Sequence, residues 1–327
     1  MQPITDQQIK DFKDAFPAVL ENESMGAHTS LKIGGPSRLY FVAKTADEVV
    51  AAISKARELQ IPWFVFGGGS NLLVSDDGYE GVIIQVADRT VEIQDTKVKA
   101  AAGAFTSFVS QVAADAGLTG FEWGATMPGT IGGAVFGDAG CYGGEMRDIV
   151  SSVEVYDVKN SERKVLSNAD CKFDYRDSRF KHEPFIILFV TLKLQPGDKA
   201  KIKATIQELM EKRKKSQPQG EFSAGCLFKN FVYIDESALD ILKRQGDEIP
   251  TDMLGNKRIA AGWLIDKLGL KGQTIGKAQV SQAHGNFLVN LGGARAQDVL
   301  ALSSLVKMKV RDELGIMLED EIQYLGF

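Results

Sequence analysis

Cysteine and histidine are scarce in this sequence, and their spacing limits the chemistry available to it. The 327 residues include three cysteines and three histidines. The cysteines are odd in number and none forms a CxxC pair, so neither a disulfide framework nor a zinc site is indicated. The histidines are equally scattered, and we therefore expect no metal centre. The six residues are Cys141, Cys171, Cys226, His28, His182 and His284.

Long apolar runs and an excess of positive charge are missing too. No apolar run reaches the length that spans a membrane, and the first residues lack a basic segment followed by an apolar one. We therefore expect a cytoplasmic protein that does not bind membranes. The net charge is −5, from 38 basic and 43 acidic residues. Nucleic acid is not an expected partner, and local basic groups must hold any anionic ligand.

Both common nucleotide-binding motifs are absent. The glycine loop at residues 67–71, GGGSN, directly follows an apolar strand predicted at residues 63–66. A helix, a strand and a glycine loop in this order are typical of an α/β nucleotide site. However, the loop lacks the Gly-Lys-Ser/Thr of a P-loop, and Leu72 stands where GxGxxG requires its last glycine. Any nucleotide must be held by another scaffold.

Glycine, in contrast, is abundant in one stretch. Residues 124–145 include eight glycines among 22 residues. Such a run either turns tightly several times or lies against a ligand with its amides exposed to it. Together with residues 67–71 it would suit the phosphates of a large anionic cofactor, because converging N–H groups satisfy phosphate oxygens. Purely structural turns remain the alternative for each loop.

The pattern of apolar residues predicts alternating helices and strands. A chain of this length favours two or three domains, and Gln195-Pro-Gly-Asp198 is the clearest boundary. Thr45 and Glu48 form a predicted capping box. We expect helices at residues 5–20, from 45 onward, at 105–116, from 199 to 215, at 259–270 and at 298–314, with Gly117 and Gly315 ending the helices at 105–116 and 298–314. The apolar face predicted for the helix at 105–116 consists of Phe105, Phe108, Val109, Val112 and Ala116. Strands are expected at 81–86, at 91–102 with a turn at 94–96, and at 287–290, and strands of a mixed sheet at 153–158, 164–166 and 185–194.

Three polar features have ordinary explanations as well as functional ones. The cations at residues 212–215 suit the negative end of a helix dipole, but they could also meet a diphosphate. Cys226, between a glycine and two apolar residues, is typical of a small buried hydrophobe. The acidic residues of the tail at 318–325 are typical of a solvated edge strand.

Taken together, the motifs resemble the MurB family, the UDP-N-acetylenolpyruvoylglucosamine reductases. The chain is similar to the shorter type, because it lacks room for the extra loop of one branch. Eight motifs fall in the family's order: 67–71 GGGSN, 128–134 PGTIGGA, 139–143 AGCYG, 175–178 YRDS, 223–230 SAGCLFKN, 261–272 AGWLIDKLGLKG, 284–290 HGNFLVN and 318–322 LEDEI.

This resemblance implies an α/β (α+β) fold of the vanillyl-alcohol-oxidase or PCMH type. FAD-binding subdomains would span residues 1–86 and 87–197, and a substrate-binding domain would span 198–327, with the tail 316–327 returning toward the flavin. FAD would be bound non-covalently. The residues that the resemblance assigns to FAD binding are Gly67, Gly68, Gly69, Ser70, Asn71, Pro128, Gly129, Thr130, Gly132, Gly133, Ala134 and Gly140.

The implied activity is the NADPH-dependent reduction of UDP-N-acetylglucosamine enolpyruvate to UDP-N-acetylmuramate, in peptidoglycan precursor synthesis, by a monomer. Flavin N5 would pass hydride to the β-carbon, and a proton would complete the α-carbon. Negative charge then develops on an enolate conjugated to the substrate carboxylate. A cation or acid beside that carboxylate lowers the barrier, and one good electrostatic contact contributes about 3 kcal/mol.

The resemblance assigns the catalytic roles to Arg176, Cys226 and Glu321. Arginine offers a fork to a carboxylate, and a glutamate beside that carboxylate needs a raised pKa or a shared proton. Glu319 is a less favoured alternative to Glu321. The family usually has serine at position 226, and a thiol with a pKa of about 8.5 is mostly protonated at neutral pH and can donate instead. The resemblance also implies substrate contacts at Tyr175, Lys229, Asn230 and His284. For the substrate diphosphate we add the basic residues Arg213 and Lys214 as a hypothesis.

Asp138 is a second departure, because asparagine is common in the family at this position. A carboxylate near a diphosphate is repulsive unless it is paired or turned away, so we leave Asp138 out of the site. Two other functions stay open from the sequence. An FAD-dependent oxidase of the same superfamily would let O₂ reoxidise its flavin without an enolpyruvyl substrate, and a non-catalytic nucleotide-sugar-binding or flavin-binding protein would bind its ligand without consuming NADPH.

Overall fold

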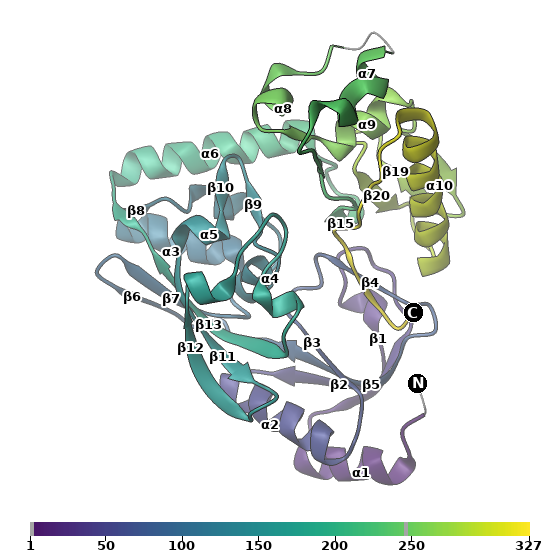
Figure 1. The fold of residues 1–327 in the computed structure, drawn as a ribbon. Helices are drawn as coiled ribbons and strands as arrows, with labels where there is room; N and C mark the ends of the chain where they lie inside the picture. Colours follow the sequence, from purple (N-terminus) through teal and green to yellow (C-terminus); the bar gives the residue numbers. More distant parts are fainter. Residues whose placement is uncertain (1–2, 245–247) are drawn as a thin grey trace. The chain divides into compact units, whose positions relative to one another are not determined.

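A computed structural model describes residues 3–244 and 248–327 (Figure 1). The chain forms two compact units, each assembled from segments that are distant in sequence. Unit 1 comprises Met1–Glu23, Ser37–Gly69 and Tyr79–Lys215, and unit 2 comprises Ser24–Pro36, Ser70–Gly78 and Ser216–Phe327. The three domains expected from the sequence, with boundaries at residues 86 and 197, stay a prediction.

Unit 1 begins with an α/β layer. In its first sheet, β2 (Pro36–Ala43) and β3 (Trp63–Phe66) both run parallel to β5 (Tyr79–Val86), which lies between them, and β1 (Leu20–Ser24) lies beside β2. Residues 82–84 of β5 are completely buried, as is usual for the centre of a parallel sheet. Helix α2 (Ala46–Glu58) packs against β5.

The first two helices show how local signals set helix ends. Helix α1 (Asp6–Ala15) starts at a capping box between Thr5 and Gln8. It ends before residue 20, where the sequence pattern had placed its end, because Pro17 restricts the residue before it and cannot donate a hydrogen bond. At α2, Thr45 accepts the Glu48 N–H, but the Glu48 carboxylate accepts the N–H of Lys44 instead of that of Thr45. The predicted capping box is therefore only half formed.

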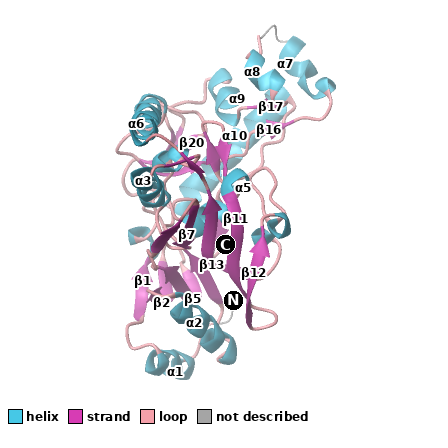
Figure 2. Cartoon of the chain, turned by 90° about the vertical axis from the view of Figure 1, so that its left-hand side faces the viewer, coloured by secondary structure: helices cyan, strands magenta, loops and turns pink. Residues whose placement is uncertain are grey.

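The second sheet of unit 1 is antiparallel, so the expectation of a mixed sheet was wrong for these strands. Its order is β12 (Glu162–Ser167), β11 (Val150–Asp157), β13 (Phe185–Lys193), β7 (Lys97–Ala101) and β6 (Val91–Gln94), and every neighbouring pair is antiparallel. Figure 2 shows β11, β13 and β7 side by side. The remaining helices and short strands of unit 1 are α3 (Thr106–Ala116), β8 (Leu118–Thr119), α4 (Ile131–Phe136), β9 (Gly140–Cys141), β10 (Gly144–Glu145), α5 (Met146–Ile149), β14 (Gln195–Pro196) and α6 (Lys199–Ser216).

Helix α3 begins and ends where the sequence predicts, and Gly117 caps it in the left-handed conformation with φ 79°. Its buried face was predicted only in part, since Val109 is buried as expected. Phe105 and Phe108 are 44% and 49% exposed, whereas Thr106 and Ser110 are buried. Their hydroxyls donate to the main-chain oxygens of Met127 and Phe121, at 2.6 and 2.7 Å. This hydroxyl-bearing face fixes the loop that leads into the second glycine run.

Unit 2 has its own core around an antiparallel sheet in the order β15 (Phe222–Cys226), β20 (Phe287–Asn290), β19 (Ala278–Val280) and β18 (Thr274–Ile275). Helix α10 (Ala296–Leu314) ends at Gly315, as predicted. The Asp76 carboxylate caps its start by accepting the N–H of Ala296 at 2.8 Å. The remaining α-helices and strands described in unit 2 are β4 (Leu72–Val74), β16 (Phe231–Val232), α7 (Asp240–Arg244), α8 (Thr251–Gly255), β17 (Arg258–Ile259), α9 (Ala261–Lys267) and β21 (Gln323–Leu325).

The C-terminal strand pairs with a strand from the first quarter of the sequence. β21 runs parallel to β4, with Gln323 opposite Leu72 and Leu325 opposite Val74. The tail is therefore part of the folded body of unit 2. Its return toward a flavin stays a prediction. Within residues 3–244 and 248–327, no helix is long and apolar enough to cross a membrane, and no three His, Cys, Asp or Glu side chains are grouped to hold a metal.

Candidate active site

The two predicted cofactor loops meet within unit 1. A Cβ atom on Gly67 would lie 2.2 Å from Thr130 Oγ1, and one on Gly68 would lie 3.3 Å from Gly129 Cα. Distances this short leave no room for a side chain at position 67. The structure thus brings together the loops that the sequence placed in one cofactor site.

Glycine is also required where the second loop contacts Ala102, the residue after strand β7 (Lys97–Ala101). A Cβ on Gly132 would lie 2.7 Å from Ala102 Cβ, whereas one on Gly133 would meet nothing closer than Thr130 Oγ1 at 3.6 Å. Thr130 caps α4 by accepting the Gly133 N–H at 3.4 Å. Close packing thus explains several glycines without a ligand. Of the other predicted contacts, Pro128 is exposed, Ser70 is half-buried, and Gly69 and Ala134 are buried.

Arg89 supplies a positive charge beside these loops that the sequence analysis missed. Its guanidinium lies 4.2 Å from the ring centroid of Phe105, and Phe105 forms a β-bridge with Thr130. The buried Nη1 of Arg89 has no hydrogen-bond partner among the residues that the structure describes. A buried guanidinium N–H without a partner costs free energy, so a hydrogen bond to an anionic oxygen would be favourable here. The pair of glycine loops and this cation fit a cofactor that carries phosphates.

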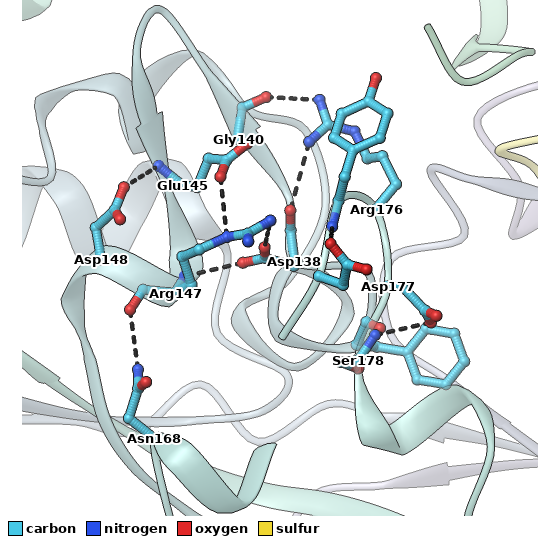
Figure 3. Close-up of polar contacts among 12 residues, drawn as sticks. Asp138, Gly140, Glu145, Arg147, Asp148, Asn168, Arg176, Asp177 and Ser178 are labelled. Atoms are coloured by element: carbon cyan, nitrogen blue, oxygen red, sulfur yellow. Dashed lines mark hydrogen bonds and ion pairs between the residues drawn. The ribbon is translucent and has the colours of Figure 1, made fainter. Parts of the chain in front are cut away.

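Arg176 lies in a tight turn of unit 1, at a main-chain angle that disfavours arginine. Asp174 and Asp177 close the turn with two main-chain hydrogen bonds of 3.0 and 2.9 Å, and Arg176 has a φ of 54°. Its guanidinium donates to the carbonyl oxygens of Asp138 and Gly140, at 3.4 and 2.9 Å (Figure 3). A positive φ on a bulky residue marks a position that function or packing maintains against strain. Tyr175, another predicted contact, lies 5.3 Å from the Arg176 guanidinium, measured to the ring centroid.

The Asp138 carboxylate is paired, which is the condition the sequence analysis set for an acid in this loop. It is completely buried, and its two oxygens bind the N–H of Arg147 at 2.8 Å and the guanidinium of Arg147 at 2.6 Å. Arg147 also contacts Glu145 at 2.9 Å. Burial raises the pKa of Asp138, and the contacts with Arg147 oppose that shift. Figure 3 shows this cluster beside Arg176.

Two of the predicted substrate-binding cations differ in their surroundings. Lys214 is exposed and forms an ion pair with Glu211 at 2.7 Å. Arg213, the neighbouring residue on α6, is half-buried. Burial raises the pKa of the Cys141 thiol, and the positive charges of Arg213 and Arg176 act against this shift. The charges of Arg213 and Arg176 therefore both act on Cys141. Whether Arg213 or Lys214 contacts the substrate stays a prediction.

In unit 2, Cys226 ends a strand that contains a bulge. Cys226 lies opposite Phe287 and Ser223 lies opposite Val289, with a register shift between them. Gly225 has a φ of 80° at this shift. The extra residue turns the strand locally and re-aims the side chain that follows. Cys226 is half-buried and not disulfide-bonded, so it is not the fully buried hydrophobe of the alternative interpretation.

Asn286 holds the loop that follows Cys226, and the sequence analysis assigned it no role. Its side chain accepts the N–H of Phe228 at 3.0 Å and donates to the Phe228 oxygen at 2.7 Å. Its main-chain oxygen accepts the N–H of Leu227 at 2.8 Å. Asn286 is 2% exposed. The signal in the sequence was an amide within an apolar run, where a buried polar side chain needs a partner.

The tail that carries Glu321 lies along this same loop. The Glu321 N–H donates to Leu227 O at 2.8 Å, and the Lys229 N–H donates to Glu319 O at 2.8 Å. Phe228 and Asp320 form a β-bridge. Cys226 and Glu321, two of the predicted catalytic residues, are therefore carried by paired backbone segments of unit 2.

The other acids of the tail have partners of their own. Glu319 is exposed and contacts Lys229 Nζ at 3.3 Å, while the Asp320 carboxylate contacts Lys307 at 2.6 Å. Of the remaining predicted substrate contacts, the Asn230 side chain accepts the Ala261 N–H at 3.2 Å. His284 Nδ1 accepts the Asn286 N–H at 3.1 Å. Burial lowers the pKa of His284, so it is the neutral imidazole that the fold favours.

Comparison with known proteins identifies the family. Residues 217–325 match the family model of the UDP-N-acetylenolpyruvoylglucosamine reductase C-terminal domain, and residues 37–166 match that of an FAD binding domain. The reductase of Caldanaerobacter subterraneus subsp. tengcongensis is 39% identical over 306 residues, with 93% of each chain covered. The reductase of Clostridioides difficile is 36% identical over 307 residues, covering 93% of this chain and 92% of that one.

A solved structure agrees. The crystal structure of UDP-N-acetylenolpyruvylglucosamine reductase (MurB) from Thermus caldophilus has 35% sequence identity and a TM-score of 0.72, covering 93% of this chain and 98% of that chain. These matches confirm the family, the FAD-binding fold and the FAD cofactor that the motifs predicted. The chain belongs to the UDP-N-acetylenolpyruvoylglucosamine reductase family.

Proposed function

We propose that this protein reduces UDP-N-acetylglucosamine enolpyruvate to UDP-N-acetylmuramate, with NADPH as the reductant and FAD as the hydride carrier. The names of its relatives support the reaction. The observation that carries the assignment of residues is the pairing of the Cys226 loop with the tail that carries Glu321, through the hydrogen bond from Glu321 N to Leu227 O at 2.8 Å. A half-buried thiol and a carboxyl group are thereby held on adjoining segments.

FAD, when bound, takes hydride from NADPH and delivers it to the β-carbon of the substrate's enol ether. In this proposal the loops at residues 67–71 and 128–134 hold its diphosphate through main-chain N–H groups, and Arg89 adds a nearby positive charge. The absence of side chains at Gly67 and Gly68 lets these two loops approach each other.

Arg176 would bind the carboxylate of the substrate. Two main-chain carbonyl oxygens already hold its guanidinium, those of Asp138 and Gly140. Because its orientation is set before the substrate arrives, little reorganisation is needed when negative charge develops next to that carboxylate. Such preorganised contacts contribute about 3 kcal/mol to transition-state stabilisation.

Cys226 would complete the reaction by donating its Sγ proton to the α-carbon. A thiol is a much stronger acid than the serine hydroxyl usual in the family, and it is still mostly protonated at neutral pH. Glu321 would act beside the substrate carboxylate, where a protonated carboxyl group stabilises the developing charge.

Half-reaction kinetics test the role of Cys226. We expect Cys226→Ala to stop substrate reduction, because the proton donor is gone, while NADPH still bleaches the flavin at the wild-type rate. Cys226→Ser should keep part of the activity. Stopped-flow absorbance of the flavin separates the two steps.

The matched control is Cys171→Ala, which removes a thiol buried in the core of unit 1. This variant should reduce substrate at the wild-type rate in its folded fraction. If Cys226→Ala turned over as fast as the wild type, Cys226 would not be the donor. The cytoplasmic location and the monomeric state stay predictions, which cell fractionation and sedimentation would test.

A further inference from the structure

Asn71 belongs to the first glycine loop, yet its side chain is engaged with the C-terminal tail. Its Nδ2 donates to the main-chain oxygen of Glu321 at 3.0 Å. Its own main-chain oxygen accepts the N–H of Gln323 at 3.0 Å. These contacts come immediately before the paired strands β4 and β21 and extend their pairing by a side chain. Asn71 is therefore built into the tail's attachment to unit 2.

The contacts of Glu321 show what this hydrogen bond does. The N–H of Glu321 is held by Leu227 O, and its carbonyl oxygen is held by Asn71 Nδ2. A second amide, Gln323 Nε2, is 3.4 Å from the same oxygen. Both peptide groups of Glu321 are thus fixed, and the next residue, Ile322, is 3% exposed. The main chain cannot rotate to re-aim the carboxyl group while both bonds are intact.

We propose that Asn71 is a positioning residue, whose side-chain amide sets the orientation of Glu321 during substrate reduction. This inference rests on the proposed function, in which Glu321 acts beside the substrate carboxylate. It differs from the role that the motif suggested, in which Asn71 contacts the cofactor. A side-chain amide has one NH₂ group with limited reach, and the structure directs it to Glu321.

The hydrogen bond of Asn71 should contribute little to stability and much to the rate of substrate reduction. Asn71 is exposed, so losing its bond should cost no more than about 1 kcal/mol of stability. A small misplacement of a catalytic group, in contrast, can reduce the rate by on the order of 100-fold. Substitution of Asn71 should therefore change the reaction far more than the folding.

The experiment compares Asn71→Asp, which keeps the shape and removes the donor, with Asn71→Ala. We expect both variants to bind FAD with wild-type affinity, measured by quenching of flavin fluorescence, and to be reduced by NADPH at the wild-type rate. Reoxidation of the reduced flavin by UDP-N-acetylglucosamine enolpyruvate should slow by about tenfold to 100-fold. If FAD binding weakens and substrate reoxidation of the fully loaded enzyme stays at the wild-type rate, Asn71 is a cofactor contact and the inference is wrong.

A double-variant cycle tests whether Asn71 acts through Glu321. The variant Asn71→Asp/Glu321→Gln should be no slower than Glu321→Gln alone, because positioning a missing carboxyl group brings no benefit. Independent, multiplicative effects would overturn the inference. The control is Asn290→Ala, which removes another hydrogen bond that a side-chain amide of unit 2 donates, from Asn290 Nδ2 to Leu31 O at 3.0 Å. That variant should lose stability without a slower substrate step.

Failure of the proposed function would look different. If the wild-type protein did not oxidise its reduced flavin with this substrate, the proposed reaction would be wrong whatever Asn71 does. If the wild type reacts and Glu321→Gln matches its rate, the role of Glu321 fails. A normal substrate step in the Asn71 variants, alongside a slow Glu321→Gln, would overturn the inference and leave the proposed function intact.

Discussion

The glycine loops of unit 1 and the Cys226 loop of unit 2 reach defined shapes by different means. The glycine loops approach each other because side chains are absent, since a Cβ atom on Gly67 would lie only 2.2 Å from Thr130 Oγ1. The Cys226 loop is held by hydrogen bonds from Asn286 and from the tail. A loop whose conformation depends on close packing should be disrupted by the addition of a single atom. A loop held by several hydrogen bonds should lose only part of its stability when one bond is removed.

The largest effect that this comparison predicts is at Gly67. Gly67→Ala places a Cβ 2.2 Å from Thr130 Oγ1, so the two loops must separate. Overpacking of this kind costs about 1–3 kcal/mol, and we expect the Kd for FAD, measured by fluorescence titration, to rise by up to about 100-fold.

Two further variants sharpen this prediction. Thr130→Ala in the same chain removes the clashing atom and should restore part of the affinity. Gly137→Ala is the matched control, because its Cβ would meet nothing closer than 3.9 Å. If Gly67→Ala and Gly137→Ala lost equal affinity for FAD, the effect would come from the conformational freedom of glycine and not from the contact between the two loops.

A smaller effect is expected at Arg89, where unit 1 relies on charge as well as shape. Arg89→Met keeps the contact with Phe105 and removes the buried guanidinium N–H that has no partner among the described residues. A hydrogen bond to a charged group contributes about 1.5 kcal/mol, so the Kd for FAD should rise about tenfold. Riboflavin, which has no phosphate, should bind equally well to both proteins.

Arg163→Met serves as the control for this prediction, since Arg163 pairs with Asp47 on the surface of the same unit. Its loss should leave FAD binding unchanged. An equal loss of riboflavin and FAD affinity in Arg89→Met would show that Arg89 supports the fold and not the phosphates.

The smallest effect concerns the stability of unit 2 as the pH falls. Burial lowers the pKa of His284 in the folded protein, below the value of about 6.5 in an unfolded chain. The unfolded chain therefore binds the proton more readily, and the stabilisation is complete above about pH 6.5 and is lost as the pH falls through the folded pKa. The free energy of unfolding, from urea titrations at pH 7.5 and 5.5, should drop less in His284→Gln than in the wild type. Identical drops would contradict this account.

The sequence predicted those features that depend on neighbouring residues. The apolar runs at β3 and β5, the turn between β6 and β7, and the glycine stops of α3 and α10 are all local signals, and all lie where they were expected. The motif order also predicted the family correctly. What the sequence could not show were contacts made across long distances.

Three differences illustrate this limit. The face of α3 was misassigned because Thr106 and Ser110 are buried by hydrogen bonds to a loop, which an apolar pattern cannot register. The antiparallel order of the second sheet depends on pairing between distant strands. Asn71 and Asn286 find their partners 250 and 58 positions away, so nothing adjacent in the sequence reveals what they hold.

The pairing of β4 with β21 has a consequence for biosynthesis. Residues 72–74 emerge from the ribosome early, but the strand beside them cannot form until residues 323–325 have been made. Closing so long a loop is slow and entropically costly. In a nascent chain the cofactor loops would therefore be present long before the Glu321 carboxyl group could be positioned. Catalysis would begin only after residues 323–325 had been translated and paired with β4.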